Sequence, residues 1–494
     1  MPWPESLLPY TGRSSTAIAG PSQASLEASP CEHRQYRVTI NTLPDEALLE
    51  IFHFYVNGWP IRTNGWHKLV HVCQRWRHIV FESPRRLSLQ LEYTGNSPMS
   101  EMLDVWPALP VVIRQGYTSW KVLESYPDSW GNVAGALESE RHHRICEIHL
   151  PVIPTSYRQR LAAAMQKPFP ELTFLRLWVE DTATSLPDSF LGGSAPLLRH
   201  LSLSNCAFPG LPKLLLSSNQ LVLLRLFDIP DSGYISPQDL GTALSVMFRL
   251  ETLGVDFRSP RYPASRPPPP LTRSVLPALT DLYLCGVYEY LEDLLAQIEA
   301  PLLKKLEIMF FMDLDFAVPQ LHRLIGQAGS FKSCNNASVS TSDRAIQFSI
   351  FRVTDQSPEL SLRISCRELD GQLSSLAQVC SSTFPLLSTL VHLDIADGVS
   401  QSHWKDDTAA TQWLELLDPF TAVKDLRLSR QVAPHVCRAL KELAEERVTD
   451  ILPALQNVFL SGMQPLNSVP KYIEGFVAAR QLSGHPVAVH RLGG

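Results

Sequence analysis

The chain has 494 residues, of which 19% are charged, and its net charge is −6. This length accommodates roughly three average domains, or one small domain followed by an extended array. The acidic balance excludes the electrostatic signature of a nucleic-acid-binding or basic membrane-surface protein, so the expected partner is a protein or a small molecule.

The nine cysteines lie scattered from Cys31 to Cys437 without any C-x-x-C spacing. An odd number without that spacing argues against a disulfide framework and against a zinc finger. No basic segment followed by an apolar core opens the chain, and no apolar run reaches the roughly 18 residues of a membrane span. We therefore expect an intracellular protein, cytoplasmic and/or nuclear.

Residues 1–38 are rich in Ser, Pro, Ala and Gly and lack hydrophobic periodicity, which predicts a disordered leader. From Pro44 onward, apolar residues recur at three- and four-residue steps, which predicts a helix. Asp45 and Glu46 occupy its first turn, where helix N-termini favour negative charge.

A second helical pattern follows at residues 66–80, whose apolar residues fall on one continuous face. Leu87, Leu89 and Leu91 then alternate with other residues, which is the period-two pattern of a strand. The helical part is only about 40 residues long, near the lower size limit of an independent domain. It therefore needs support from the rest of the chain or from a partner.

This helical segment resembles an F-box. The resemblance covers residues 39–85 and rests on the ordered motifs LPDE-x-LLEIF, from Leu43 to Phe52, and VC-x-RWR-x-I, from Val72 to Ile79. The LDVWPALPVVI run that follows is also similar to fungal F-box proteins. Membership of that family implies a small helical domain that docks onto a Skp-type adaptor of a cullin-RING ubiquitin ligase.

Carried over by position, the resemblance implies adaptor contacts from eight apolar residues: Leu43, Pro44, Leu49, Ile51, Leu69, Val72, Cys73 and Trp76. The VNGWPIRTNGW segment between the helices is longer than in the minimal family pattern. The same residues also fit the core of a helical hairpin, because apolar helix faces usually pack inward. Both alternatives can hold, with part of the face inside and part on a partner.

After residue 140 the phrase L-x-x-L-x-L, with conservative replacements, returns ten times. The phrases begin at Ile145, Leu172, Leu198, Leu221, Leu250, Leu279, Leu303, Leu390, Val423 and Leu455. A period of roughly 20–29 residues with this phrase is typical of leucine-rich repeats, in which parallel strands line a horseshoe. The long interval between Leu303 and Leu390 predicts one or two degenerate units there. Helical patterns at 290–300 and 434–448 fit return helices between strands.

The sequence thus predicts an α/β protein: a small helical F-box domain followed by an irregular leucine-rich-repeat solenoid, with parallel strands on the concave face and helices or loops on the convex face. We expect residues 86–140 to form a linker region leading into the array, and residues 141–494 to form the solenoid. The composition of residues 258–274 predicts a Pro-rich loop that leaves the solenoid. This loop is more simply explained as a mobile insertion than as an SH3-type ligand. Most phrases lack the usual Asn or Cys after the last Leu, Cys206 being an exception.

Alternate residues of a strand point to opposite faces, so the residues between the leucines should line the concave surface. As substrate-binding residues we select the exposed aromatic and charged positions Arg176, Trp178, Arg225, Phe227, Tyr283, Glu307 and Arg427. Aromatic residues and Arg among mixed charges are typical of protein-binding surfaces. The alternative is that the aromatic side chains fill space beside short neighbours.

Motifs of catalysis are absent from the sequence: it has no G-x-S-x-G, H-E-x-x-H, Walker loop or G-x-G-x-x-G. His142, His143 and Cys146 lie together, but Arg141 and Arg144 flank them, so a solvated basic turn is expected rather than a metal site. We expect no catalytic residue, no metal ligand and no cofactor.

The combination predicts a non-enzymatic substrate-recognition subunit of an SCF-type cullin-RING E3 ubiquitin ligase. Its F-box would bind a Skp-type adaptor, and its solenoid would bind the protein to be ubiquitinated. The alternative is a repeat-based protein-binding scaffold without a ligase role, in which the helical domain caps the N-terminal end of the solenoid.

Overall fold

The structure is a computed structural model, and it describes residues 40–57, 65–95, 98–106, 108–115, 127–180, 185–257, 272–311, 318–342, 345–352, 358–365, 369–380, 384, 386–397, 406–442, 448–461 and 471–492. The predicted disordered leader, residues 1–38, lies outside these ranges. The predicted Pro-rich loop, 258–274, also lies outside them, except for residues 272–274.

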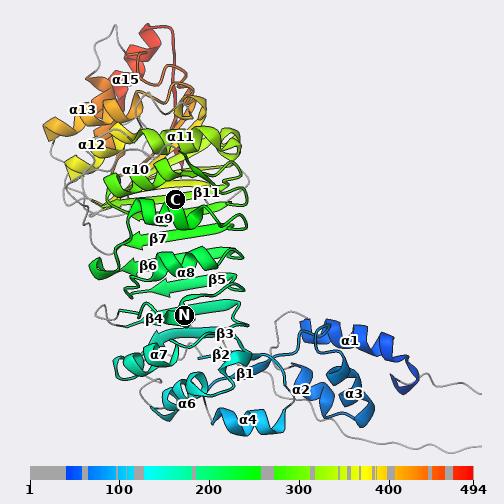
Figure 1. The fold of residues 1–494 in the computed structure, drawn as a ribbon. Coiled ribbons are helices and arrows are strands. Elements are labelled where there is room, and N and C mark those ends of the chain that lie inside the picture. Colours follow the sequence, from blue (N-terminus) through cyan, green and yellow to red (C-terminus); the bar gives the residue numbers. More distant parts are fainter. Residues whose placement is uncertain are drawn as a thin grey trace, which may run out of the picture.

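The described chain begins with a helical unit made of η1 (Ile40–Thr42), α1 (Asp45–Asn57), α2 (Gly65–Val70) and α3 (Gln74–Glu82) (Figure 1). Its core lies between α1 and α3, where the ring centroids of Phe52 and Trp76 are 4.7 Å apart and Ile79 is buried. The predicted continuous helix over 66–80 is wrong. The backbone is extended at Cys73, and the Arg77 Nε donates to the carbonyl of Val70 (3.0 Å), which satisfies the end of α2.

Two tryptophans connect the helical unit to the rest of the molecule. The indole Nε1 of Trp66 in α2 donates to the carbonyl of Gln90 (3.0 Å), just before the first strand. Trp106, at the C-cap of α4 (Met99–Val105), lies 5.3 Å from Trp66 between ring centroids and stacks on His67. The helical unit therefore packs against the beginning of the sheet (Figure 1).

One sixteen-stranded sheet runs through the remainder of the described residues. Its strands, in spatial order, are β1 (Leu91–Tyr93), β2 (Val111–Arg114), β3 (Ile145–Ile153), β4 (Phe174–Val179), β5 (His200–Ser204), β6 (Leu223–Ile229), β7 (Thr252–Phe257), β9 (Asp281–Gly286), β11 (Lys305–Phe311), β14 (Leu360–Ser365), β13 (Ala345–Phe351), β12 (Asn336–Ser342), β15 (His392–Asp397), β16 (Asp425–Ser429), β17 (Asn457–Ser461) and β18 (Ala488–Leu492). All ten predicted phrases fall on strands. The sheet begins at Leu91, so the stretch 86–140, expected to be a linker region, supplies its first two strands.

The order of strands is inverted between β11 and β15. After β11 the chain reaches β12 first, then returns through β13 and β14, which pairs with β11. β13 is antiparallel to both its neighbours, whereas the other pairs in this sheet are parallel. The one or two degenerate repeats expected between Leu303 and Leu390 are therefore replaced by a three-strand meander. The spacing of the repeated phrase does not reveal this meander, because β11 pairs with β14 and not with the next strand in the chain.

Helices cover one face of the sheet (Figure 1). They and the shorter turns are α6 (Pro127–Glu138), η2 (His142–Arg144), η3 (Thr155–Tyr157), α7 (Arg158–Ala164), η4 (Phe190–Gly193), α8 (Leu211–Ser217), η5 (Asp231–Gly233), α9 (Pro237–Leu244), α10 (Tyr288–Gln297), α11 (Pro319–Gln327), η6 (Gly329–Ser333), α12 (Leu369–Val379), η7 (Leu387–Thr389), α13 (Asp406–Leu417), α14 (Ala433–Lys441) and α15 (Lys471–Leu482). Two short strands, β8 (Ser274–Val275) and β10 (Ile298–Glu299), pair separately.

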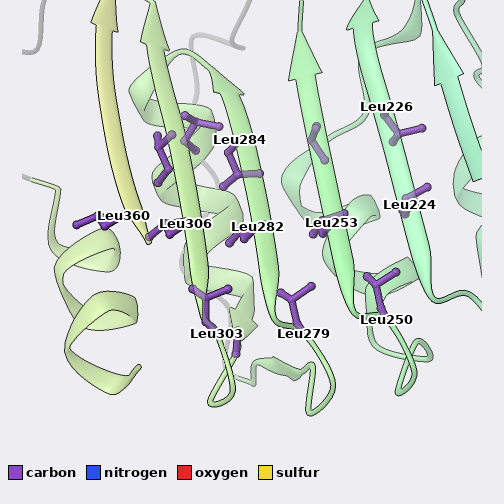
Figure 2. Packing of buried hydrophobic residues seen from close by; sticks show 14 of the residues in the cluster. Leu224, Leu226, Leu250, Leu253, Leu279, Leu282, Leu284, Leu303, Leu306 and Leu360 are labelled. Atoms are coloured by element: carbon purple, nitrogen blue, oxygen red, sulfur yellow. The ribbon is translucent and has the colours of Figure 1, made fainter. Parts of the chain in front are cut away.

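The leucines of the repeated phrase form the core between sheet and helices. Figure 2 shows them stacked from strand to strand, for example Leu224, Leu253, Leu282 and Leu306 at one level, all of them buried. Burial of an aliphatic side chain contributes about 1.5–3 kcal/mol. Because each unit buries its leucines against its neighbours, stability is shared along the array.

Two adjacent helices are connected by a buried carboxylate. Glu292 of α10 accepts hydrogen bonds from the backbone N–H groups of Gln320 and Leu321, at 2.9 and 3.0 Å, in the first turn of α11. The negative charge lies where the helix N-terminus leaves unpaired N–H groups, and it satisfies two of them.

Over the described part of the chain, no helix combines the length and apolar character needed to span a bilayer.

Candidate protein-binding surfaces

The eight predicted adaptor-binding residues divide between the core and the surface of the helical unit. Leu49 and Leu69 are buried, at 8% and 6% exposure, and Leu43 and Trp76 are half-buried against the core. The remaining four, Pro44, Ile51, Val72 and Cys73, are exposed. Only this second group is available to a partner without rearrangement of the fold.

The helix α1 carries apolar residues on two faces. Leu48, Leu49, Phe52 and Val56 face the core, as the 3.6-residue period requires. On another face, Ile51 (44% exposed) is followed three and four residues later by Phe54 (73%) and Tyr55 (37%). With Pro44, they form what we call the apolar patch of the helical unit. Phe54 and Tyr55 were not among the predicted site residues, although the helix carries more apolar residues than one buried face accounts for, which was a signal for them.

Arg75 holds the starts of α1 and α3 together. Its guanidinium lies 2.5 Å from the Asp45 carboxylate and donates to the Leu43 carbonyl at 2.6 Å. This contact brings the turn before α3, with exposed Val72 and Cys73, to the end of α1 that carries Pro44. Glu50 and Arg86 form a second ion pair across the unit. Exposed ion pairs stabilise little, so these contacts mainly fix orientation.

A second surface is the open face of the sheet, which is the face opposite the helices. Cross-strand register aligns its side chains in rows, and the central row runs His149, Arg176, Ser202, Arg225, Gly254, Tyr283, Glu307, Ser361, Ser349, Ser338, Asp394, Arg427 and Phe459. Five predicted substrate-binding residues lie in this row: Arg176, Arg225, Tyr283, Glu307 and Arg427. The other two, Trp178 and Phe227, lie two residues further along β4 and β6. The seven therefore share one face, spread over many strands.

A cavity of about 210 Å³ lies on the open face between β6 and β11. Arg225, Phe227, Tyr283 and Glu307 line it, and the rings of Phe227 and Tyr283 meet edge to face at 5.4 Å between centroids. Gly254 provides the space for this contact, since a β-carbon there would lie 3.1 Å from Phe227 Cε1. Thr252, Gly254 and Lys305 also line the cavity and were not among the predicted substrate-binding residues.

A larger cavity, of about 400 Å³, lies on the open face near the C-terminal end. Arg427 lines it with Asp394 and Phe459, and so do Asn336 and His392. His392 lies 2.8 Å from Asp425, whereas the guanidinium of Arg427 is 3.9 Å from Asp394. Asn336 and His392 come together only because β12 pairs with β15, so reasoning along the sequence missed them.

Burial changes the protonation of several groups on the open face. Burial raises the pKa of the Asp256 carboxyl to about 6, against a favourable hydrogen bond with Cys285, and nearby Asp228 adds to the rise. Burial also raises the pKa of Asp394, partly offset by Arg427. The Glu147 carboxyl shifts the other way, because a hydrogen bond from His149 lowers its pKa. The open face therefore carries carboxyl groups with different protonation behaviour.

The polar groups around β3 make contacts with the backbone. His142 and His143 hydrogen-bond through Nδ1 to the carbonyls of Ser139 and Glu140, and Cys146 Sγ donates to the Val111 carbonyl. Within the described ranges, no three His, Cys, Asp or Glu side chains are grouped in a way that could hold a metal ion.

One cross-strand contact ties β4, β5 and β6 together. Asn205, at the end of β5, donates from Nδ2 to the Val179 carbonyl (2.7 Å), and its backbone N–H donates to the Phe227 carbonyl (2.9 Å). Its left-handed φ of 60° is a conformation that Asn tolerates. Cys206, which matches the repeat consensus, is buried next to it.

Comparisons with known proteins give little similarity in sequence. No family model matches the chain, and no curated protein matches it. Among solved structures, it is similar to the leucine-rich repeat-containing protein LegL7 from Legionella pneumophila, with 13% identity over 69% of this chain and 91% of that one, at a TM-score of 0.26. A TM-score this low does not show that the two chains share a fold. The parallel strand order and the buried leucine ladder show that the chain forms a leucine-rich-repeat-like solenoid preceded by a helical unit.

Proposed function

We propose that this protein is a non-catalytic substrate receptor of an SCF-type cullin-RING ubiquitin ligase. The helical unit binds a Skp-type adaptor, and the open face of the solenoid binds the protein to be ubiquitinated. Catalysis belongs to the partner enzyme, and this chain contributes proximity and orientation. It acts in the cytoplasm and/or the nucleus, without a cofactor of its own.

The observation that carries this proposal is the apolar patch on α1. The unit already buries Leu48, Phe52 and Ile79 in its own core, so exposed Ile51 and Phe54 are not needed for its folding. Exposed apolar side chains that are grouped on one helix face are typical of interaction sites. The motif resemblance at Leu43–Phe52 gives this patch a partner of known kind.

The alternative is a scaffold in which the helical unit only caps the solenoid. The contact of Trp66 with the Gln90 carbonyl, and its packing on Trp106, favour a capping role, because they cover the first strand. A capping role involves the α2 side of the unit, however, and does not explain the exposed apolar residues of α1. The two roles are therefore compatible, and the adaptor test separates them.

The test is capture of a purified Skp-type adaptor by the full chain. We expect wild type to bind, and Ile51→Glu and the double variant Leu43→Ala/Pro44→Ala to lose binding. Lys68→Glu, at an exposed position of α2 in the same unit, is the matched control and should bind as wild type does. Circular dichroism establishes that each variant is folded. If folded wild type does not capture the adaptor, the ligase role is wrong and the scaffold role replaces it.

A further inference from the structure

We propose that the larger cavity on the open face, of about 400 Å³ between β13 and β17, binds an arginine side chain of the partner protein. We call it the C-terminal cavity. The inference rests on the proposed use of the open face for binding a protein, and it specifies one residue that this protein must present.

Strand pairing assembles the C-terminal cavity from parts of the chain that are distant in sequence. Asn336 of β12 lies opposite Phe351 of β13 on one side and opposite His392 of β15 on the other. Asp394 follows His392 by two residues, so it is on the same face of β15. All four side chains line the cavity. A positive group bound among them therefore contacts a carboxylate, an amide and an aromatic ring together.

The two carboxylates of the cavity differ in how well their charges are compensated. Asp425 has His392 Nδ1 at 2.8 Å and accepts a hydrogen bond from Asn457 Nδ2 at 2.7 Å. The Oδ2 of Asp394, in contrast, is 3.9 Å from Arg427 Nη1, which is too far for a hydrogen bond. Burial raises the pKa of Asp394, and Arg427 offsets only part of the rise. A further cation beside Asp394 would replace the solvation that the fold removes.

Asn336 presents a second acceptor in the same part of the cavity. Its Oδ1 is buried and accepts no hydrogen bond from the residues that the structure describes. A buried acceptor without a donor is unfavourable, so a ligand that supplies the donor is favoured. The amide lines the cavity, and rotation about its χ2 angle directs the oxygen toward a bound group. The expected ligand is therefore a cation with several N–H donors.

This pair of acceptors favours a guanidinium over an ammonium group. Asn336 and Asp394 are diagonal neighbours on adjacent strands, about 8 Å apart. A planar guanidinium has five N–H donors in a fixed fork and can bridge the two, whereas a compact ammonium reaches only one. Phe351, directly opposite Asn336, provides a ring on which the guanidinium can stack. The ammonium is also more strongly hydrated, which makes its burial more costly.

The width of the cavity indicates a protein segment rather than a free small molecule. Its lining reaches from Phe351 on β13 to Phe459 on β17, four strand spacings away, or about 19 Å. This distance corresponds to about six residues of an extended chain. The Phe459 ring stacks on His490 at 4.9 Å between centroids and offers an apolar end for the residues that flank the arginine.

The experiment uses the full chain and three immobilised peptide libraries with random flanks. Their fixed central residue is arginine, lysine or citrulline, which is neutral and has nearly the shape of arginine. We expect at least about tenfold stronger capture by the arginine library than by the citrulline library, because charge-assisted hydrogen bonds are lost. The preference for arginine over lysine should be about threefold.

Three variants test which residues produce these preferences. Asp394→Asn removes the charge with little change of shape and should lower the preference for arginine over citrulline about tenfold. Asn336→Leu removes the second acceptor and should abolish only the preference for arginine over lysine. Asp281→Asn removes a carboxylate from the other cavity of the open face; it is the matched control and should keep both preferences. Circular dichroism establishes that each variant is folded.

Three results would overturn the inference. Equal capture by the citrulline library, or an equal loss in Asp281→Asn, would show that the C-terminal cavity is not a site for a cation. Equal capture by the lysine library would refute the choice of arginine. Free N-acetyl-arginine amide is the competitor: if it displaces the library at the concentration of the peptides themselves, the ligand is a small guanidinium compound and not a protein segment.

Adaptor binding, measured on the same samples, separates this inference from the proposed function. A chain that binds the adaptor without preferring arginine keeps the ligase role and loses the arginine site. A chain that prefers arginine and ignores the adaptor keeps the arginine site and loses the ligase role.

Discussion

Phe227 lies directly against Gly254 on the neighbouring strand: a β-carbon added at Gly254 would be 3.1 Å from Cε1 and 3.2 Å from Cζ of the Phe227 ring. The absence of a side chain at this point of the central row allows Phe227 to lean toward β7 and to meet Tyr283 beyond it. The position of one wall of the cavity between β6 and β11 therefore depends on a glycine in the next repeat.

Replacement of this glycine should change the aromatic contact more than stability. In Gly254→Val, the added methyl groups displace the partly exposed Phe227 ring, while the strand gains a residue that favours extended backbone. We expect the free energy of unfolding, measured by urea denaturation, to change by less than about 1 kcal/mol, and the near-UV circular dichroism of the Phe227 and Tyr283 pair to change. Thr252→Val on the same strand should leave both unchanged. An unchanged near-UV spectrum in Gly254→Val would show that Phe227 does not depend on the space at Gly254.

Leu49 and Ile51 should separate folding from adaptor binding within one helix. Leu49→Ala removes a buried side chain and should lower the free energy of unfolding by about 2–4 kcal/mol, measured by urea denaturation. Ile51→Ala removes an exposed one, so its effect on stability should stay within about 0.5 kcal/mol. The affinity for the adaptor should fall in Ile51→Ala, although this variant remains fully folded. Equal stability loss in the two variants would contradict the division of α1 into an inner and an outer face.

The carboxylate of Glu292 should stabilise α11 from outside that helix. Glu292→Ala leaves the part-buried N–H group of Gln320 and the buried one of Leu321 without this acceptor, and we expect the free energy of unfolding in urea to fall by about 2–3 kcal/mol. Glu292→Gln retains one acceptor oxygen and should lose less. Glu289→Ala, earlier on α10, is the control. Faster amide exchange confined to α11 would locate the effect, whereas unchanged exchange there would refute it.

The raised pKa of Asp256 predicts that its ionisation destabilises the folded chain. Because the folded pKa is about 6 and the ordinary value is 3.8, this carboxyl contributes stability that is complete below pH 4 and is lost as the pH rises through 6. Asp256→Asn is neutral at every pH and can keep the contact with Cys285. We expect it to match wild type at pH 4 and to exceed it by about 1 kcal/mol at pH 7.5, after allowance for partial exposure. A difference independent of pH would contradict this assignment.

The repeated phrase was predictable because its physical basis is local. Leucines at alternate positions must share a face of a strand, so all ten phrases fall on strands, and equivalent positions such as Arg176 and Arg225 fall into one row. The division of the F-box-like residues was not predictable, because it depends on how α1 and α3 pack. Leu49 and Ile51 are both apolar and close in sequence, yet only one is buried. The meeting of Asn336 with His392 depends on strand order, which no local pattern encodes.

The inverted order of β12, β13 and β14 has a consequence for synthesis of the chain. When β11 leaves the ribosome, the strand that will cover its edge is β14, and β12 and β13 must be made first. Until β14 is made, the edge of β11 therefore has unpaired backbone hydrogen-bonding groups, and such an edge can pair with other chains. The later repeats in turn have no template until β12 has its partner β13 in place. Growth of this solenoid is thus interrupted at one seam, where a single repeat cannot be inserted or deleted without breaking the pairing on both sides.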